Sequence, residues 1–287
     1  RLGGRIYRVP DFHPLTYKRH LRALDQFFAR HPEYRVVITA SVLGMYALRA
    51  AKAAGVPVRI AHAQASQILE FNLKYPFMKH AVHGLNAVTT HRFGCSAEAA
   101  VMHFGPKVLQ ADDYRFMPNA IDVEQYLFSE TRRAIKRREM GFDGKLVFGS
   151  VGRFARIKNF PFLVEVFHHL HKARPDSLLV LIGAGETLEQ TRAVVSRLGL
   201  NDSVMLLGYR DDKEDLLQAM DYFVIPSIRE GLPLVAVEAQ AAGLKCFAST
   251  GIPREAKILD SFQFLDLKAG AAQWARAILA GLEYQRE

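Results

Sequence analysis

Apolar runs alternate with helix-like stretches along the second half of the chain. After residue 144, runs of about four to eight apolar residues are separated by Gly, Pro or Asp from stretches with helical periodicity. The expected strands are Lys145–Gly152, Ser177–Gly183, Val204–Gly208, Tyr222–Ser227 and Lys245–Ser249. The expected helices between them are Phe160–Ala173, Thr187–Leu198, Lys213–Met220 and Pro233–Ala242. Because such apolar strands suit a parallel sheet covered on both faces, residues 141–287 are expected to form a doubly wound α/β domain.

The first half shows the same alternation less regularly. The expected helices are Tyr17–Arg30 and Leu43–Ala54, and the expected strands are Arg35–Thr39, Val58–Ala61, Arg92–Cys95 and Arg115–Met117. Residues 1–140 therefore predict a second α/β domain, with the charged segment Phe128–Gly144 as the junction. The five cations of that segment are also typical of a solvated helix face: Arg132, Arg133, Lys136, Arg137 and Arg138. Two such domains in one chain imply a cleft between them.

The composition is that of a globular protein. With 49% hydrophobic and 23% charged residues, it excludes a disordered tail, a collagen-like fibre and a coiled coil. The two cysteines, Cys95 and Cys246, are too far apart in sequence for a disulfide framework, and no Cys or His cluster has the spacing of a zinc site. We therefore expect a reducing, cytoplasmic setting and no bound metal. The longest apolar stretch, Val36–Leu48, is too short to span a bilayer.

Positive charge is concentrated in the first half. The formal net charge is +9; residues 1–140 carry 21 Lys and Arg against 11 Asp and Glu, whereas residues 141–287 carry 17 against 18. A basic surface attracts the phosphates of nucleic acids, lipid headgroups or nucleotide-linked substrates, and an ordinary solvated face is the alternative. Segment Phe71–His91, rich in Lys and aromatic residues, would suit peripheral contact with an anionic inner membrane face; a core segment broken or kinked at Pro76 explains it equally well. The cations are not interleaved with a nucleic-acid recognition motif, so we expect no nucleic-acid partner.

The turn Gly183-Ala-Gly185 lies between an expected strand and an expected helix. Leu188 occupies the place of the third glycine of a dinucleotide fingerprint, and no Walker-type Gly-Lys-Ser/Thr occurs. A tight strand-to-helix turn explains both glycines and is the interpretation we prefer. Even so, the turn lies at the edge of the sheet where α/β proteins bind ligands.

A cationic loop follows the first strand of the second domain. Gly152 and Arg153 begin this loop, and Lys158 ends it. Because the carboxyl ends of parallel strands face the ligand crevice, the two cations could converge on a diphosphate. Surface cations are common, so the spacing alone is only suggestive.

Two glutamates flank the start of the last expected helix, Pro233–Ala242. Glu230 lies in the loop ahead of it, and the free backbone N–H groups of Gly231 and Leu232 would form an anion site together with the helix dipole. Glu238 lies on the helix among apolar residues, where a buried carboxylate needs a partner. A ribose diol would serve as that partner, and an exposed helix glutamate is the equal alternative.

Together these motifs resemble a known family. Gly152-Arg153 with Lys158, Gly183-Ala-Gly185, Gly208-Tyr209-Arg210 and Glu230-x7-Glu238 occur in the order and spacing of family 4 retaining glycosyltransferases. In particular, the chain resembles the bacterial branch that builds exopolysaccharide and capsule. The resemblance covers nearly the whole chain, and the pattern in residues 148–244 is highly specific. It implies the GT-B fold, with two Rossmann-like doubly wound parallel-sheet domains and a cleft between them.

The resemblance also implies roles for individual residues. A nucleotide-sugar, by family resemblance a UDP-sugar, would bind mainly to the second domain and donate its sugar to a glycan or lipid-linked acceptor held by the first, with no cofactor or metal. Arg153 and Lys158 would hold the diphosphate and replace the metal, and the amides of Gly231 and Leu232 would bind the sugar's phosphate. Glu230 would contact the transferred sugar and Glu238 the ribose. Tyr209 would lie near the base, and His62 near the reacting carbon on the acceptor side, although a lone His is more often structural.

The chain also departs from the family pattern. Family members open with a strand, a Gly-rich loop and a helix, and they close with a helix that returns to the first domain; neither is recognisable here. We therefore expect a truncated chain with an incomplete first domain, which binds nucleotide and transfers sugar poorly or not at all. The alternatives are a non-catalytic nucleotide-sugar-binding module of the same fold and a GT-B nucleotide-sugar epimerase, which would need no acceptor.

Overall fold

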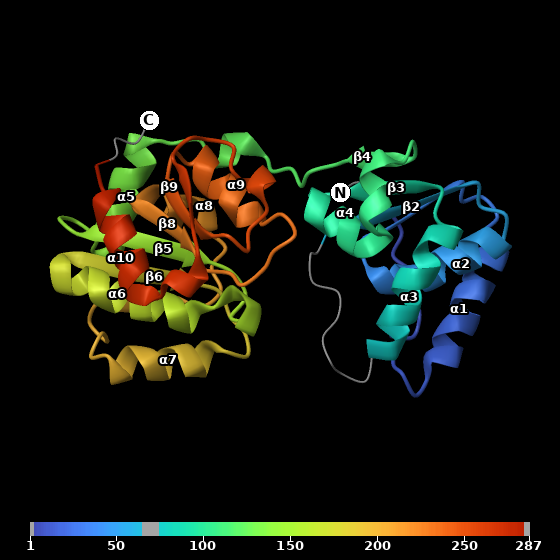
Figure 1. The fold of residues 1–287 in the computed structure, drawn as a ribbon, viewed down its shortest axis with the longest axis horizontal. Helices are drawn as coiled ribbons and strands as arrows, with labels where there is room; N and C mark the ends of the chain where they lie inside the picture. The colour runs from blue at the N-terminus through green and yellow to red at the C-terminus, as the bar shows by residue number, and fades with distance from the viewer. Residues whose placement is uncertain (1–2, 65–74, 284–287) are drawn as a thin grey trace. The chain divides into compact units, whose positions relative to one another are not determined.

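The chain folds into two α/β units, residues 1–118 (unit 1) and residues 119–287 (unit 2) (Figure 1). The computed structural model describes residues 3–64 and 75–283. The predicted α/β class with parallel sheets is confirmed in both units. The predicted cleft between two domains stays a prediction.

Unit 1 contains a four-stranded parallel sheet in the order β1-β2-β3-β4. Its strands are β1 (Val36–Thr39), β2 (Val58–Ala63), β3 (His91–Gly94) and β4 (Tyr114–Phe116). Its helices are α1 (Tyr17–Arg30), α2 (Met45–Ala53), α3 (Tyr75–Val88) and α4 (Ala97–Phe104). Each of α2, α3 and α4 connects two neighbouring strands, so the strand order runs in one direction through the described part of this unit.

Part of the segment predicted to face a membrane forms α3. This helix begins at Tyr75, and Pro76 lies in its first turn, where a missing N–H costs no intrahelical hydrogen bond. Within the described residues the helix therefore continues through Pro76, and a break of the segment just ahead of Tyr75 stays a prediction. Ala81, Leu85 and Val88 are buried, so one face of α3 belongs to the core. Phe71 and Lys74 lie outside the described residues. Every helix in the described parts of the chain is too short or too polar to traverse a lipid bilayer.

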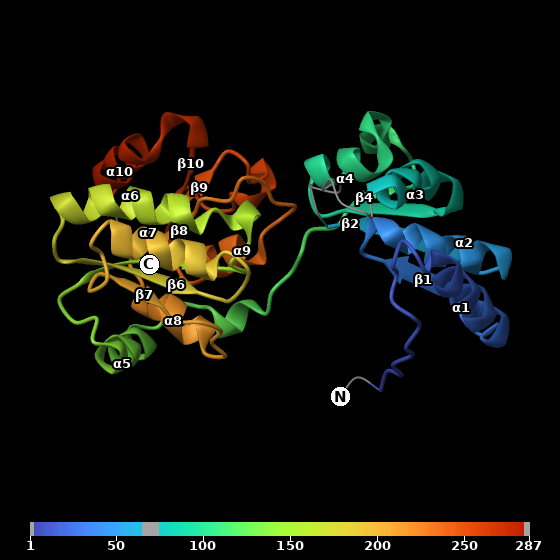
Figure 2. The same cartoon turned by 90° about the horizontal axis from the view of Figure 1, so that it is seen from below.

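Unit 2 contains a six-stranded parallel sheet in the order β10-β9-β8-β5-β6-β7. Its strands are β5 (Leu146–Val151), β6 (Ser177–Ile182), β7 (Val204–Leu206), β8 (Tyr222–Ile225), β9 (Lys245–Ser249) and β10 (Phe262–Leu265). Its helices are α5 (Glu130–Met140), α6 (Phe160–Ala173), α7 (Leu188–Arg197), α8 (Lys213–Ala219), α9 (Leu234–Ala241) and α10 (Ala271–Ala280). Figure 2 shows α6, α7 and α10 on one face of the sheet and α8 on the other.

The sheet of unit 2 is buried on both faces, as its apolar sequence predicts. All four residues of β8 are buried, and Phe148 of β5 is 1% exposed. The helix α6 turns Phe160, Leu163 and Phe167 toward this core, at the spacing of one helical face. Asn159, at positive φ, precedes α6, and a proline stands in its first turn, which sets where the helix begins.

The boundary between the two units lies earlier than the predicted junction at Phe128–Gly144. That segment forms α5, which begins after Ser129, whose hydroxyl accepts a hydrogen bond from the Arg132 amide, and ends at Gly141 in the left-handed conformation. The helix packs against α8, so the expected domain split at residues 140 and 141 is wrong: residues 119–140 belong to unit 2.

Ion pairs made by the charged face of α5 explain why this helix packs against the rest of unit 2. Arg133 and Arg137 both pair with Asp221 at the start of β8, and Lys136 donates to Asp212 at 2.9 Å. A run of cations that resembles a linker in the sequence is therefore the paired face of a docked helix. It is a helix face, as the alternative interpretation expected, but Arg133, Lys136 and Arg137 on it are bound by carboxylates.

Candidate functional site

The strand order of unit 2 reverses between β5 and β8. From β5 the chain proceeds to β6 and β7 on one side, and from β8 to β9 and β10 on the other. Open α/β sheets bind ligands at the carboxyl ends of the two strands that flank such a switch point. The loops that follow β5 and β8 are the two segments singled out in the sequence.

These two loops lie side by side. The amide of Ile228, after β8, donates to the carbonyl of Ile157, after β5, at 2.7 Å. The side-chain amide of Asn159 also donates to the carbonyl of Pro226 at 3.3 Å. The cationic loop and the segment that leads into α9 therefore lie next to each other at the carboxyl ends of β5 and β8.

Lys158 and Glu230 form an ion pair across these loops. Lys158 Nζ donates to Glu230 Oε1 at 2.5 Å, and the Ser227 hydroxyl donates to the same oxygen at 2.8 Å. Only 19% of the Lys158 side chain and 14% of the Glu230 side chain are exposed. The cation predicted to hold a diphosphate is thus fixed in place and has a carboxylate as its partner.

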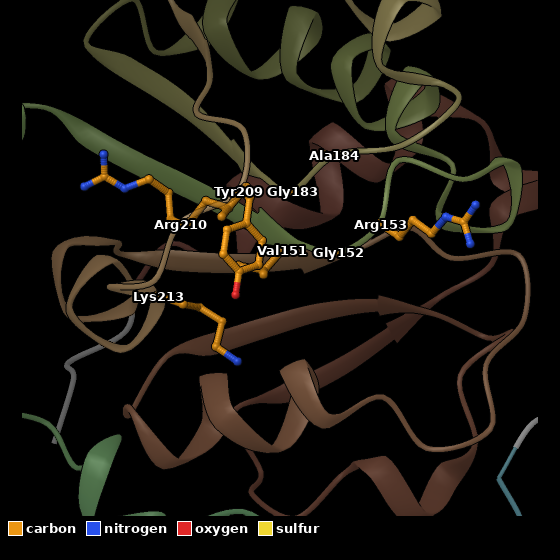
Figure 3. A pocket seen from close by; sticks show the side chains of 9 residues that line it. Val151, Gly152, Arg153, Gly183, Ala184, Tyr209, Arg210 and Lys213 are labelled. Carbon is orange, nitrogen blue, oxygen red and sulfur yellow. The ribbon is translucent and has the colours of Figure 1, made fainter. Parts of the chain in front are cut away.

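Arg153, unlike Lys158, is exposed and pairs with a carboxylate on the surface. Its side chain is 73% exposed, and its guanidinium pairs with Glu186 at 3.1 Å. Figure 3 shows the guanidinium pointing away from the side chains of Tyr209 and Lys213. The structure therefore places Arg153 in the predicted loop, with its charged group bound to a surface carboxylate.

A pocket of about 330 Å³ opens between the ends of β5, β6 and β7 (Figure 3). Its walls are formed by Val151, Gly152, Arg153, Ile182, Gly183, Ala184, Tyr209, Arg210 and Lys213. Four residues predicted to contact the donor line it: Gly152, Arg153, Gly183 and Tyr209.

The glycine turn of this pocket is required by backbone packing. Gly183 has a φ of +136°, and a Cβ added there would lie 1.9 Å from the carbonyl oxygen of Gly152. A Cβ added at Gly185, whose φ is +153°, would lie 2.5 Å from the carbonyl oxygen of Phe154. The preferred interpretation of a tight strand-to-helix turn is confirmed, and Gly183 lines the pocket as well.

Tyr209 and Arg210 form the wall that follows β7. Tyr209 is 79% exposed, and its hydroxyl is directed toward Lys213 in Figure 3. Arg210 points away from these two and forms a bidentate pair with Asp212, with bonds of 2.8 and 2.7 Å. This guanidinium, together with Lys136, holds the pKa of the Asp212 carboxyl well below its usual range.

Glu238 is a buried carboxylate, with only 5% of the residue exposed. Its Oε1 accepts hydrogen bonds from Lys213 Nζ at 2.7 Å and from the Tyr126 hydroxyl at 3.1 Å. Its Oε2 is buried and has no hydrogen-bond partner among the described residues. The alternative of an exposed helix glutamate is therefore wrong.

The pKa values of Lys213 and Tyr126 are shifted in this buried cluster with Glu238. Burial lowers the pKa of Lys213, but its hydrogen bond to Glu238 and the charge of that carboxylate raise it by more, so the net pKa lies above the usual value. Burial raises the pKa of Tyr126. Lys213 remains an ammonium and Tyr126 a phenol at neutral pH, so both donate to Glu238.

The start of α9 presents two backbone donors. The helix runs from Leu234 to Ala241, and Pro233 is its N-cap rather than a residue of its first turn. Within residues 75–283, the amides of Gly231 and Leu232 donate no hydrogen bond, although both residues are buried. Asn119 fixes this segment, because its side-chain amide donates to the Leu232 carbonyl at 3.0 Å. Buried amides without a partner favour binding of an anion.

His62 lies in unit 1, near the carboxyl end of β2. Its Nε2 donates to the Met117 carbonyl at 3.1 Å, and the Gln64 side-chain amide donates to its Nδ1 at 3.2 Å. Both ring nitrogens thus have hydrogen-bond partners within unit 1. Its role near the reacting carbon stays a prediction.

Two functional candidates were missed in the sequence. Lys213 follows the end of β7 at the same sheet edge as the cationic loop, which was a usable signal. Tyr126 carried no signal, because its contact with Glu238 joins segments far apart in the chain. Among the described residues, no three His, Cys, Asp or Glu side chains gather into a cluster suited to a metal ion.

Comparison with known proteins identifies the family. The model of the family "Glycosyl transferases group 1" matches residues 132–283, more than half of the chain. The chain belongs to this family of glycosyltransferases. EpsF of Bacillus subtilis (strain 168), named as a glycosyltransferase, is 33% identical over 96% of this chain and 73% of its own length. The "UDP-Gal:alpha-D-GlcNAc-diphosphoundecaprenol alpha-1,3-galactosyltransferase" of Escherichia coli is 33% identical over 46% of this chain and 35% of its own.

Solved structures confirm the predicted GT-B fold of this glycosyltransferase. Anabaena HepE, crystallised with UDP and glucose, aligns with a TM-score of 0.78 over 96% of this chain and 74% of its own, at 19% identity. WaaG, a glycosyltransferase involved in lipopolysaccharide biosynthesis, aligns with a TM-score of 0.74 over 96% of this chain and 76% of its own, at 16% identity. At these identities the likeness establishes the fold alone.

Proposed function

We propose that this glycosyltransferase binds a UDP-sugar at the switch point of unit 2 and transfers the sugar, with retention of configuration, to a glycan or lipid-linked acceptor. The observation that carries the proposal is the meeting of the Lys158 loop with the start of α9 at the ends of β5 and β8. One largely buried cation and two amides that have no hydrogen-bond acceptor among the described residues suit a diphosphate.

The relatives support the choice of donor and acceptor. HepE has been solved with UDP and with UDP-glucose. The Escherichia coli relative is named for UDP-Gal and for an acceptor that carries diphosphoundecaprenol. We infer a UDP-sugar and an acceptor of that general class for this chain, in line with the exopolysaccharide and capsule branch that its motifs resemble. Peripheral contact with an anionic membrane fits such an acceptor.

The chemistry follows from where charge develops. The bond between the anomeric carbon and the phosphate oxygen breaks, and negative charge accumulates on the diphosphate. Lys158 and the amides of Gly231 and Leu232 stabilise that charge, and Arg153 joins them by exchanging Glu186 for phosphate. The acceptor hydroxyl oxygen bonds to the same face of the anomeric carbon, and its proton passes to the departing diphosphate oxygen. Glu230 orients the sugar, Glu238 binds the ribose, Tyr209 lies beside the base and His62 serves the acceptor side.

The test is isothermal titration of UDP, GDP and ADP into the whole chain. We expect UDP to bind, and the double variant Arg153→Ala/Lys158→Ala to lose at least about tenfold in affinity, since a hydrogen bond to a charged group contributes about 1.5–3 kcal/mol. The matched control is Lys172→Ala/Arg174→Ala, which removes one Lys and one Arg at the end of α6.

Three results would contradict the proposal. Undiminished UDP affinity in Arg153→Ala/Lys158→Ala would overturn the diphosphate assignment. Tight UDP binding without release of UDP from any UDP-sugar, with acceptor present, would favour the non-catalytic module. Conversion of the donor sugar without an acceptor would favour the epimerase.

A further inference from the structure

The two carboxylate oxygens of Glu238 have different surroundings. Oε1 accepts from two donors, Lys213 Nζ at 2.7 Å and the Tyr126 hydroxyl at 3.1 Å. Oε2 is buried, yet no described residue donates to it. A buried carboxylate oxygen without a donor is costly, so a hydrogen bond from a group outside the described residues would stabilise this atom.

Only certain groups of a nucleoside diphosphate can supply that bond. An ionised carboxylate oxygen is an acceptor only, and the diphosphate of UDP carries no donor at neutral pH. The donors of UDP are the ribose hydroxyls and one N–H of the base. Lys213 lines the pocket and its ammonium pairs with Glu238, so a single side chain links the carboxylate to the pocket wall.

We propose that Lys213 and Tyr126 are positioning residues, which saturate Oε1 of Glu238 and thereby reserve Oε2 for the ribose hydroxyls of the nucleotide. The inference rests on the proposed function, because it takes UDP as the ligand. It adds to that function the origin of selectivity for a ribose over a sugar that lacks its hydroxyls.

The geometry supports a fixed rather than a mobile carboxylate. Lys213 is the first residue of α8, and its ammonium also lies 5.5 Å from the centre of the Tyr126 ring. Tyr126 is 8% exposed, so its hydroxyl approaches Glu238 from the protein side. The two donors come from different segments, and together they restrict rotation of the Glu238 carboxylate to a single orientation.

The experiment compares two ligands that differ only in the ribose. The affinities of UDP and of 2′,3′-dideoxy-UDP are measured by calorimetry for the whole chain and for the variants Lys213→Met and Tyr126→Phe. In the unmodified protein we expect UDP to bind at least about tenfold more tightly, since hydrogen bonds to a charged acceptor are lost in the analogue. In each variant this ratio falls toward one, while the ratio of UDP to uridine affinity, which reports the diphosphate, stays unchanged.

Controls separate positioning from general damage. Lys213→Arg keeps a cation at Glu238 and should restore part of the ribose preference. Lys172→Met and Tyr222→Phe remove a Lys and a phenol elsewhere in unit 2 and should leave the preference intact. Circular dichroism verifies folding; if Lys213→Met does not fold, Tyr126→Phe carries the same readout.

Each outcome is decisive. Absence of UDP binding in the unmodified protein overturns the proposed function and the inference with it. UDP binding without preference over the dideoxy analogue overturns the role of Glu238. A full preference retained in both variants, or a gain of UDP affinity in Lys213→Met, overturns the positioning role alone and leaves UDP binding standing.

Discussion

Lys158 Nζ lies 2.5 Å from Glu230 Oε1, and this pair connects the loops that follow two neighbouring strands of unit 2. Both side chains are largely shielded from water, so their mutual attraction is stronger than that of an exposed pair. The Lys158 ammonium is fixed at the switch point between β5 and β8. A diphosphate that binds there must share this ammonium with the Glu230 carboxylate. This relationship gives opposite predictions for the two residues.

Lys158→Met should lower the affinity for UDP about tenfold or more and leave the affinity for uridine unchanged, because only the diphosphate contacts the ammonium. Glu230→Gln should bind UDP at least as tightly as the unmodified protein, because a negative charge beside the diphosphate is removed. Calorimetry with UDP and uridine measures both, with Lys172→Met as the control for loss of a lysine. An equal loss of UDP and uridine affinity in Lys158→Met would refute the assignment.

Gly183→Ala should destabilise unit 2 by about 2–4 kcal/mol. The new methyl group would overlap the Gly152 carbonyl, and the positive φ adds strain of its own. The matched control is Gly199→Ala, at a φ of +68° with no atom within 4 Å of the added carbon, for which about 1 kcal/mol is expected. Urea unfolding of both variants measures the difference. Similar losses at the two positions would show that the close approach of the two strand ends does not matter.

The stability of unit 1 should depend on the protonation of His103. This residue of α4 is 3% exposed, and burial lowers its pKa to about 4, although a hydrogen bond to the Ala99 carbonyl partly opposes the shift. Its unfolded pKa is about 6.5, so the unfolded chain binds the proton more readily. The free energy of unfolding is therefore highest above pH 6.5 and decreases as the pH falls toward 4, by up to about 1.4 kcal/mol per pH unit.

The measurement is urea unfolding between pH 7.5 and pH 5. His103→Gln keeps a polar side chain but cannot take up the proton, so its free energy of unfolding should decrease less steeply over this range. Equal slopes in the two proteins would mean that other groups account for the pH dependence.

Local sequence was sufficient to predict most elements of unit 2. Its five predicted strands and four predicted helices all occur, with ends that differ by at most two residues, while β10 and α10 were not predicted and a helix at α5 was only the alternative to a junction. Strands buried on both faces are recognisable because almost every position in them is apolar, as in β8. Residues such as Lys158 and Glu230 could be placed at strand ends for the same reason.

Which residues touch was decided by the tertiary structure. The pairing of Lys158 with Glu230 depends on β8 lying beside β5, and the contacts of Glu238 depend on α8 and on the segment before α5. The charged run of α5 was mistaken for a junction because its partner carboxylates are distant in sequence. Hydrophobic periodicity indicates which face of a helix or strand is buried. It therefore predicts where helices and strands occur and the fold class to which they belong. It does not record which element covers that face, because strand order and helix docking are set by long-range packing and by ion pairs between distant segments.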